Sequence, residues 1–481
     1  MAQTLFFYDL ETTGTNPRTD RVMQFAGQRT TLDLEPIGEP YNILIALTPD
    51  VVPEPDAILV TGITPQQTIQ DGITEAEFLK IFCAEIVSPD TVFIGYNTIR
   101  FDDEFMRYML YRNFYDPYEW QWKDGCSRWD LLDVVRMTRA LRPDGIVWPK
   151  DNEGKPTNRL ELLTSENGLD HAKAHDALSD VSASIALAKL LKTKQPKLYN
   201  YLFAMRDKRK VAKFVSVNRP FVYSSGKYAS EFEKTTVVVK LADHSKRQGA
   251  LVYDLRYNPE PFIKMTPHQL VQAWSYKPDR ASDDPKLPIK MLRYNCCPAV
   301  APLSVLDSAS QKRIGIYLAD VDANSRMLIS QTKFIQNIYK AIDLLDAKQT
   351  KTTKSTVVDA QLYDGFFSDN DKVLEQAFRQ AEPEELSDFA AKFKDKRLQQ
   401  LAPLYKARNF SSMLTAEERE TWERYLAATL LGGGESSRLA RYFTRLAELA
   451  NQPKLSKDKQ YLLEELQIYG QSIMPETAEF A

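Results

Sequence analysis

The sequence has few cysteines and glycines and no long apolar run. Its four cysteines, Cys83, Cys126, Cys296 and Cys297, include no CxxC pair, which argues against a disulfide framework and a zinc knuckle. Nowhere do 18 apolar residues follow one another, and the first nine residues lack the basic start of a secretion signal, so we expect neither a membrane span nor export. Glycine accounts for 18 residues, and no GxxxxGKS or GxxxxGKT loop for nucleotide phosphates occurs. These absences favour a chain that works in a reducing cytoplasm.

A strong excess of one charge is also missing. With 62 basic and 65 acidic side chains, the formal net charge is −3, so any contact with nucleic acid needs a local basic surface. The chain has an ordinary globular composition, with 43% hydrophobic and 26% charged residues. Its 481 residues are enough for about two to four domains.

The pattern of apolar residues divides the chain into three parts. Residues 1–196 alternate short apolar runs with amphipathic stretches, which predicts a mixed sheet flanked by helices. Residues 197–347 hold further short β-like runs, including 235–242 and 250–255, and the polar residues 349–356 have the composition of a linker. Residues 354–481 show the leucine- and alanine-rich spacing of packed helices. We therefore expect an α/β multidomain protein. In its first part the expected strands are 4–10, 22–32, 41–47 and 91–97, and the expected helices are 75–86, 102–111, 130–141 and 174–191.

Five polar residues stand out by their positions. Asp9 and Glu11 end the first expected strand, and because strand side chains alternate, both carboxylates point to the same face. Asp102 begins an expected helix about 90 residues later, where an acid often acts only as a helix cap. His175 and Asp180 would lie about 140° apart in a continuous helix, so they converge only if His175 sits at or before the first turn. Taken singly, D-x-E is weak evidence against a polar strand end, Asp102 is explained equally well as a helix cap, and a lone histidine is better explained by a surface or capping role.

Taken together, D-x-E on a first strand, an Asp preceded by Asn and Phe, and H-x4-D resemble in their order the DEDDh exonucleases, whose fold is RNase H-like. In more detail, the sequence is similar to the bacterial exodeoxyribonuclease I family. The similarity is carried by four blocks: YNTIRFD at 96–102, YRNFYDPY at 111–118, SRWDLLD at 127–133 and QLYDGFFS at 361–368. It covers most of the chain and is thinnest between residues 220 and 340. Three residues separate Asn97 from Phe101, where many superfamily members have two, and this spacing fits the exonuclease I branch.

The resemblance implies a two-metal nuclease site. Asp9, Glu11, Asp102 and Asp180 would bind two Mg²⁺ ions, which Mn²⁺ could replace, and His175 would be the general base. Two divalent ions roughly 3.5–4 Å apart stabilise both the attacking and the leaving oxygen of a phosphodiester, and Mg²⁺ prefers carboxylate oxygens. Without cations, two carboxylates roughly 4 Å apart repel by up to about 4 kcal/mol at an effective dielectric of 20. A reference pKa of about 6.5 lets a histidine take a proton from water at neutral pH.

A segment rich in aromatic residues is expected to hold the substrate. Seven of the 16 residues from 107 to 122 are aromatic, and stacking on a ring contributes roughly 1–3 kcal/mol per base, whatever the base. Tyr118 and Trp122 are the expected stacking residues. Helical spacing places three other rings in the core: Tyr108, Tyr111 and Phe114. The resemblance adds residues that would bind phosphates or the terminal nucleotide: Arg107, Arg136, Arg159, Glu11, Thr12, Thr13 and Asn97.

The implied activity is processive 3'-to-5' hydrolysis of single-stranded DNA to nucleoside 5'-monophosphates, in DNA repair and recombination. In the family, an SH3-like middle domain and a helical C-terminal domain enclose the strand. The resemblance also implies a monomer that docks the C-terminal tail of single-stranded DNA-binding protein, with Arg142 and Tyr201 in the pocket. Two alternatives stay open, an RNA-directed 3'-5' exonuclease and a non-enzymatic scaffold that binds single-stranded DNA. RNA-directed relatives are usually short single domains, and the presence of all five polar residues argues against a scaffold.

Overall fold

Strand β1 (Thr4–Thr12) lies at the centre of the first sheet. The computed structural model describes residues 3–169, 176–215, 219–244, 246–275, 284–352 and 355–475. Five strands of this sheet are ordered β3-β2-β1-β4-β5. β2 (Val22–Thr30) and β3 (Tyr41–Leu44) are antiparallel to their neighbours, whereas β4 (Thr91–Gly95) and β5 (Ser127–Asp130) run parallel to β1. The predicted mixed sheet is confirmed, and its parallel strands bring their carboxyl ends to one edge.

The side chains of β1 alternate between two apolar layers. Leu5 and Phe7 belong to the layer that α5 and α7 cover, whereas Phe6 and Tyr8 belong to the opposite layer with α3 and α4. Because Asp9 follows Phe7 at a step of two, it continues the face of the sheet that α7 covers. The helices of this part are α1 (Pro55–Thr61), α2 (Pro65–Asp71), α3 (Glu75–Ile81), η1 (Phe82–Ile86), η2 (Thr98–Arg100), α4 (Asp102–Arg112), η3 (Glu119–Gln121), η4 (Lys123–Gly125), α5 (Leu131–Leu141), α6 (Leu160–Glu166) and α7 (Ala177–Lys194).

Several element ends differ from the predicted ones. β1 continues two residues beyond its predicted end, whereas β2, β3 and β4 stop two or three residues early. The expected helix 75–86 is an α-helix followed by a π-helical turn, η1. Strand β5 is absent from the prediction, which assigns Asp130 to a helix. In the structure Asp130 ends β5, and its side chain caps α5 by accepting a hydrogen bond from the Leu132 amide at 2.9 Å.

The middle part of the chain forms a second, wholly antiparallel sheet of five strands in the order β10-β6-β7-β8-β9. The expected strands 235–242 and 250–255 are confirmed as β7 and β8. The expected linker at 349–356 begins inside a helix, because α14 continues to Thr352. The elements are α8 (Pro196–Ala204), α9 (Lys208–Val215), β6 (Phe221–Ser224), η5 (Ser230–Phe232), β7 (Thr235–Asp243), β8 (Gly249–Asp254), α10 (Glu260–Ile263), α11 (Pro267–Trp274), β9 (Ile289–Arg293), β10 (Ala299–Pro302), η6 (Leu303–Val305), α12 (Ser308–Arg313), α13 (Leu318–Ile329) and α14 (Thr332–Thr352).

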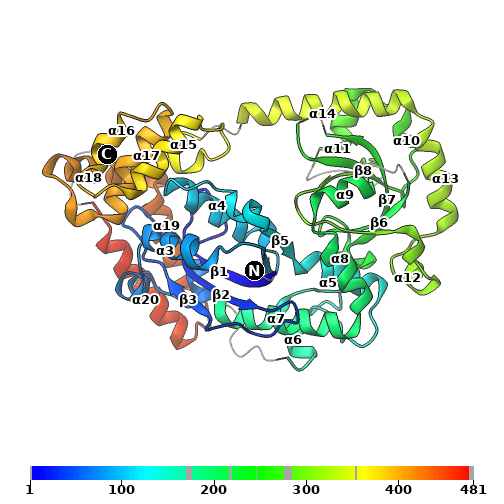
Figure 1. The fold of residues 1–481 in the computed structure, drawn as a ribbon, viewed down its shortest axis with the longest axis horizontal. Coiled ribbons are helices and arrows are strands. Elements are labelled where there is room, and N and C mark those ends of the chain that lie inside the picture. Colours follow the sequence, from blue (N-terminus) through cyan, green and yellow to red (C-terminus); the bar gives the residue numbers. More distant parts are fainter. Residues whose placement is uncertain are drawn as a thin grey trace.

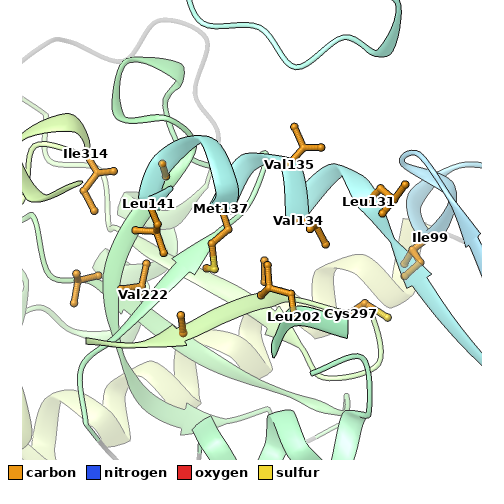
Figure 2. Packing of buried hydrophobic residues seen from close by; sticks show 14 of the residues in the cluster. Ile99, Leu131, Val134, Val135, Met137, Leu141, Leu202, Val222, Cys297 and Ile314 are labelled. Carbon is orange, nitrogen blue, oxygen red and sulfur yellow. The ribbon is translucent and has the colours of Figure 1, made fainter. Parts of the chain in front are cut away.

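Helix α5 joins the first sheet to the second. Figure 2 shows its apolar side chains, among them Val134 and Met137, over Val222 of β6 and Leu202 of α8. These residues are buried in one continuous cluster that also holds Leu5 of β1. The boundary between the first and middle parts is therefore hydrophobic core shared by both.

The last part of the chain is helical, as predicted. Figure 1 shows its helices and the second sheet on opposite sides of the first sheet, with α14 running across from the second sheet towards α15. Its elements are η7 (Val358–Ala360), α15 (Asp369–Gln380), α16 (Leu386–Ala390), α17 (Lys396–Asn409), η8 (Ser411–Met413), α18 (Ala416–Leu431), η9 (Gly434–Ser436), α19 (Arg438–Ala450) and α20 (Lys457–Ser472). Across the described ranges, no helix combines the length and the apolar character that a membrane span requires.

Candidate active site

Three carboxylates converge at the carboxyl edge of the first sheet. Asp9 and Glu11 come from β1, and Asp180 comes from the first turn of α7, which packs on that strand. One carboxylate oxygen of each residue lies within 4.8 Å of the others. The start of α7 is fixed by Asp176, whose side chain accepts from the Ser179 amide at 3.3 Å and from Nε2 of Gln24 on β2 at 3.4 Å. The local fold thus holds the first turn of α7 over the end of β1.

Asp102 reaches β1 from the connection that follows the parallel strand β4. It is the first residue of α4 and only 3% exposed, and its Oδ1 accepts a hydrogen bond from the Leu10 amide at 3.1 Å. Asp102 is not part of the 4.8 Å group, but its charge raises the pKa of Asp9. The structure therefore places Asp102 beside the strand segment that carries Asp9 and Glu11.

The pKa values of Asp9, Glu11 and Asp102 are raised. Burial is the largest cause for Asp9, and the charges of Asp102, Asp180 and Glu11 raise its pKa further. Burial followed by the charges of Asp180 and Asp102 raises the pKa of Glu11 to about 8, and burial raises the pKa of Asp102 to about 7. Among the described residues, all charges that act on Asp9 and Glu11 are negative. A bound cation would therefore favour the ionised form of both carboxyls.

The predicted general base, His175, lies outside the described residues, as does the expected start of its helix at 174. The description resumes at Asp176, and α7 runs from Ala177 to Lys194. The assignment of His175 therefore stays a prediction.

The aromatic segment after α4 divides into core and surface rings. Tyr108, Tyr111 and Phe114 are at most 2% exposed, as expected for core residues. Trp122 is 64% exposed, which fits a stacking surface. Tyr118 is half-buried, and its ring lies 5.3 Å from the guanidinium carbon of Arg107.

The three predicted phosphate-binding arginines already have acidic partners. Arg107 is 9% exposed, pairs with Glu104, and donates from Nη2 to Oε1 of Gln121 at 2.9 Å. Arg136 pairs with Asp133 at 2.6 Å. Its guanidinium also packs against Gly226, where an added Cβ would lie only 3.0 Å from Nη2 of Arg136. Arg159 pairs with Glu161, but its side chain is 65% exposed. Of the three, Arg159 therefore has the most accessible guanidinium.

The residues expected around the terminal nucleotide lie close to the carboxylates in sequence. Each of them also forms a hydrogen bond within the protein. The Thr13 amide donates to the Arg21 carbonyl at 2.9 Å, and the expected contact of Thr13 with a nucleotide stays a prediction. The Thr12 hydroxyl donates to the Gly14 carbonyl at 2.7 Å. Asn97 has a left-handed backbone with φ 72°, and its amide donates to Oδ1 of Asp130 at 3.0 Å.

Arg142 and Tyr201, the predicted partner-binding residues, both lie at the boundary between the first and middle parts. Nη2 of Arg142 donates to the Val305 carbonyl at 3.0 Å, and Nη1 lies 3.6 Å from Oδ2 of Asp307. Tyr201 is half-buried and packs against the shared core of α5 and the second sheet.

Comparison with known proteins covers nearly the whole chain. Family models match residues 6–188 as "Exonuclease", 206–342 as "Exonuclease I SH3-like domain" and 356–473 as "Exonuclease I C-terminal domain". The exodeoxyribonuclease I of Escherichia coli K12 is 37% identical over 474 residues, which cover 98% of each chain. That of Haemophilus influenzae is 40% identical over 429 residues, which cover 87% of this chain and 89% of the relative. The chain belongs to the exodeoxyribonuclease I family.

Solved structures of exonuclease I superpose on the same fold. E. coli exonuclease I in complex with a dA16 oligonucleotide aligns with a TM-score of 0.92 and 36% identity, over 98% of this chain and all of that one. The zinc-bound form of an E. coli exonuclease I complex with single-stranded DNA aligns with a TM-score of 0.92 at 37% identity, with the same coverage. An SSB/exonuclease I structure with an inhibitor aligns with a TM-score of 0.89 and 36% identity over 98% of this chain and all of that one. The predicted RNase H-like, SH3-like and helical parts are confirmed by these matches.

The carboxylates of this exonuclease fit a divalent metal ion. Asp9, Glu11 and Asp180 offer only oxygen ligands, which are the donors that hard cations such as Mg²⁺ prefer. Within the part of the chain that the structure describes, no basic side chain lowers the raised pKa of Asp9 or Glu11. A bound cation would favour the ionised form of these two carboxyls, so the donor set and its electrostatics agree.

Sequence reasoning missed several residues that shape this exonuclease site. Tyr363, from the last part of the chain, donates its hydroxyl to Oε2 of Glu104 on α4 at 2.6 Å, and its ring meets the Tyr108 ring at a centroid distance of 6.0 Å. Phe366, three residues later, is 97% exposed. Both belong to the block QLYDGFFS, which carried the resemblance but gave no indication of what it contacts. Asp103, beside Asp102, is a further residue that the sequence did not single out.

Proposed function

We propose that this exonuclease hydrolyses single-stranded DNA from its 3' end to nucleoside 5'-monophosphates, acting as a monomer with two divalent metal ions, Mg²⁺ in the first place. The observation that carries the proposal is the group formed by Asp9, Glu11 and Asp180, with oxygens within 4.8 Å of one another and, among the described residues, only negative charges acting on Asp9 and Glu11. Asp102, hydrogen-bonded to the same strand, completes the proposed ligand set.

The roles of the four carboxylates follow from their positions, and that of His175 follows from the family resemblance. When bound, the metal ions stabilise the negative charge that develops on the phosphodiester and lower the pKa of a bound water. Asp9, Glu11, Asp102 and Asp180 hold their carboxylates at fixed places on β1, α4 and α7. His175 takes the proton of the attacking water, a role that an imidazole can fill near neutral pH.

Exposed aromatic residues support a single-stranded substrate. Trp122 is 64% exposed, and Phe366 is 97% exposed on the segment that Tyr363 ties to α4. Exposed rings bind unpaired bases by stacking at roughly 1–3 kcal/mol per base without regard to sequence. Paired bases do not offer their faces, so the rings favour single strands over duplexes.

A basic surface on the second sheet supports a path for the phosphate backbone. Burial lowers the pKa of Lys227, and the neighbouring charges of Arg293, Lys290 and Arg100 lower it further. Lys227, with Arg293 and Lys290 of β9 and Arg100 of η2 near enough to act on it, gives the local basic surface that a chain with a net charge of −3 needs for nucleic acid. We place the strand along this surface between the second sheet and α4.

A second partner is proposed at the boundary of the first and middle parts. Arg142 offers a half-exposed guanidinium and Tyr201 a half-buried ring, which suit the acidic and hydrophobic tail of single-stranded DNA-binding protein. A solved SSB/exonuclease I structure with a similar fold supports this partner.

The activity is tested with 5'-labelled oligonucleotides, single-stranded and duplex, DNA and RNA, with and without chelator. We expect a ladder that shortens from the 3' end only for single-stranded DNA, and only when a divalent ion is present. Binding without any cleavage would support a scaffold, and faster cleavage of RNA would support an RNA-directed enzyme; either result contradicts the proposal.

A further inference from the structure

Asp103 is a buried carboxylate next to the proposed metal ligand Asp102, and the mechanism above does not use it. It is 1% exposed and is the second residue of α4. Its Oδ1 accepts the hydroxyl hydrogen of Tyr8, and its Oδ2 accepts from Nη1 of Arg128. Unlike Asp9, Asp103 therefore has both a neutral donor and a positive partner. A carboxylate compensated in this way is a structural element and not a free ligand.

Tyr8 and Leu10 flank Asp9 on β1, and each is bonded to one of the first two residues of α4. The Tyr8 hydroxyl reaches Asp103, and the Leu10 amide reaches Oδ1 of Asp102 at 3.1 Å. Because Asp9 lies between them in the chain, the two bonds tie the start of α4 to the strand on both sides of Asp9. They fix the separation between the carboxylates of Asp9 and Asp102.

Tyr8 is itself held firmly. It points away from Asp9, because strand side chains alternate, and it is 3% exposed. Its ring stacks on Phe25 at a centroid distance of 6.1 Å and meets the edges of Phe93 and Trp120 at 6.4 Å and 6.2 Å. The packing of the Tyr8 ring against these three rings thus positions its hydroxyl to donate to Asp103.

Arg128 connects this arrangement to the second sheet. It lies on β5, and its Nη2 donates to the carbonyl of Asn295, in the connection between β9 and β10, at 3.0 Å. Its own carbonyl accepts from Sγ of Cys297 at 3.1 Å. One guanidinium therefore binds Asp103 with one nitrogen and the middle part of the chain with another, which its planar fork allows.

We propose that Tyr8, Asp103 and Arg128 form a positioning set that holds Asp102 at the distance from Asp9 that a shared divalent ion requires. The inference rests on the proposed metal site. None of the three residues touches the ion. Their loss lets the start of α4 shift on β1, and the affinity for the ion falls while the carboxylates themselves are intact. Groups that orient metal ligands in this way typically contribute about 10- to 100-fold in metal affinity or activity.

The test compares Tyr8→Phe, Asp103→Asn and Arg128→Lys with the wild-type protein by calorimetric titration of Mn²⁺. Tyr8→Phe removes one hydroxyl, and Asp103→Asn keeps the shape but loses the charge that faces Arg128. We expect both to weaken Mn²⁺ binding by about 10-fold or more. Arg128→Lys keeps the charge but offers no fork for two partners, so we expect a smaller loss.

Tyr111→Phe is the matched control. Tyr111 lies on the same helix, is 1% exposed, and donates its hydroxyl to the Val358 carbonyl at 3.1 Å, far along α4 from Asp102. It loses an equally buried hydrogen bond, so its melting temperature reports the structural cost alone. We expect its Mn²⁺ affinity to equal that of the wild type.

Two further readouts separate positioning from general damage. High Mg²⁺ should restore the cleavage rate of Tyr8→Phe to within a few fold of wild type, and its affinity for a single-stranded oligonucleotide in chelator should change less than twofold. Any folded variant of Tyr8 or Asp103 with the wild-type Mn²⁺ isotherm overturns the inference. A wild-type protein that binds no Mn²⁺ contradicts the proposed function instead.

Discussion

Two clusters of acidic side chains lie at different places in the fold, and the pKa values of their aspartates move in opposite directions. At the active site, Asp9 is half-buried, and desolvation and neighbouring carboxylates raise its pKa well above its usual value. At the boundary with the last part of the chain, Asp50 and Asp359 are buried, at 3% exposure each. Burial would raise their pKa values too, but the charges of Arg408 and Arg21 overcome it and lower both.

The geometry explains the difference. Nη2 of Arg408 lies 2.7 Å from Asp50 and 2.6 Å from Asp359, and Nη2 of Arg21 lies 2.8 Å from Asp359. In this paired cluster, formed by Asp50, Asp359, Arg408 and Arg21, arginines of the same chain neutralise the aspartates and join two parts of the fold. At the active site, no arginine of the described residues acts on Asp9 or Glu11 in this way, and a bound cation would favour their ionised forms. Burial alone therefore does not indicate function, whereas a raised pKa caused by neighbouring carboxylates points to a functional site.

Removing a carboxylate from each cluster should give opposite results, and the loss of activity is the largest effect we expect. Asp9→Asn and Asp180→Asn remove a proposed metal ligand, and since a metal ion supplies several kcal/mol of transition-state stabilisation, the cleavage rate should fall by at least about 10³-fold. The melting temperature of Asp9→Asn should not fall, because the charges acting on Asp9 from the described residues are all negative. Both quantities are measured by the oligonucleotide assay and by thermal unfolding.

Asp50→Asn is the counterpart in the paired cluster. It loses the charge that faces Arg408, so it should melt earlier while it cleaves DNA at close to the wild-type rate below its transition. An Asp9→Asn protein that stays active, or an Asp50→Asn protein as stable as wild type, would contradict the distinction between the two clusters.

The next largest effect concerns the arginine that both carboxylates of the paired cluster share. Arg408→Met leaves Asp50 and Asp359 buried without their main partner, and breaking a buried pair in this way typically costs about 3–5 kcal/mol. The urea midpoint for unfolding of the last part of the chain should fall accordingly. Arg445→Met serves as control, because its pairs with Asp56 and Glu448 lie on the surface. If the two variants lose equal stability, the paired cluster is not the anchor we infer.

Much of the site could be predicted because it depends on local spacing. Asp9 and Glu11 share a face through their separation of two residues, and Asp180 lies in the first turn of the helix that packs on their strand. β5 escaped prediction because it has only four residues, Ser127–Asp130, and ends directly in a helix. The partners of the paired cluster and of Asp103 could not be found, since Asp50 and Arg408 are 358 residues apart and Tyr8 and Asp103 are 95 apart. Only the folded chain shows which carboxylates have a counter-charge.

Acid should weaken the paired cluster in a defined direction. The pKa values of Asp50 and Asp359 are lowered in the folded protein, so each takes up its proton at lower pH than in the unfolded chain, where an aspartate titrates at about 3.9. Their contribution to stability is present above that pH and is lost as the pH falls towards their folded values. We expect the urea midpoint of wild type to fall below about pH 4. In Arg408→Met, where the main cause of the lowered pKa is gone, the fall should be shallower, and parallel curves for the two proteins would argue against the assignment.

The smallest expected effect is stabilisation by added Mg²⁺, and it distinguishes the active-site carboxylates from the paired cluster most directly. A ligand that binds only the folded state at about 100 times its dissociation constant adds about 2.7 kcal/mol of stability. Mg²⁺ should therefore raise the melting temperature of wild type above that in NaCl of equal ionic strength, which controls for screening. Arg408→Met should show the same rise from a lower starting temperature, because its arginine never served the site. Asp9→Asn should show no rise in melting temperature, since it has lost a proposed ligand of the ion. A rise in all three proteins would mean that Mg²⁺ binds elsewhere, and the contrast between a cluster completed by arginine and one completed by metal would fail.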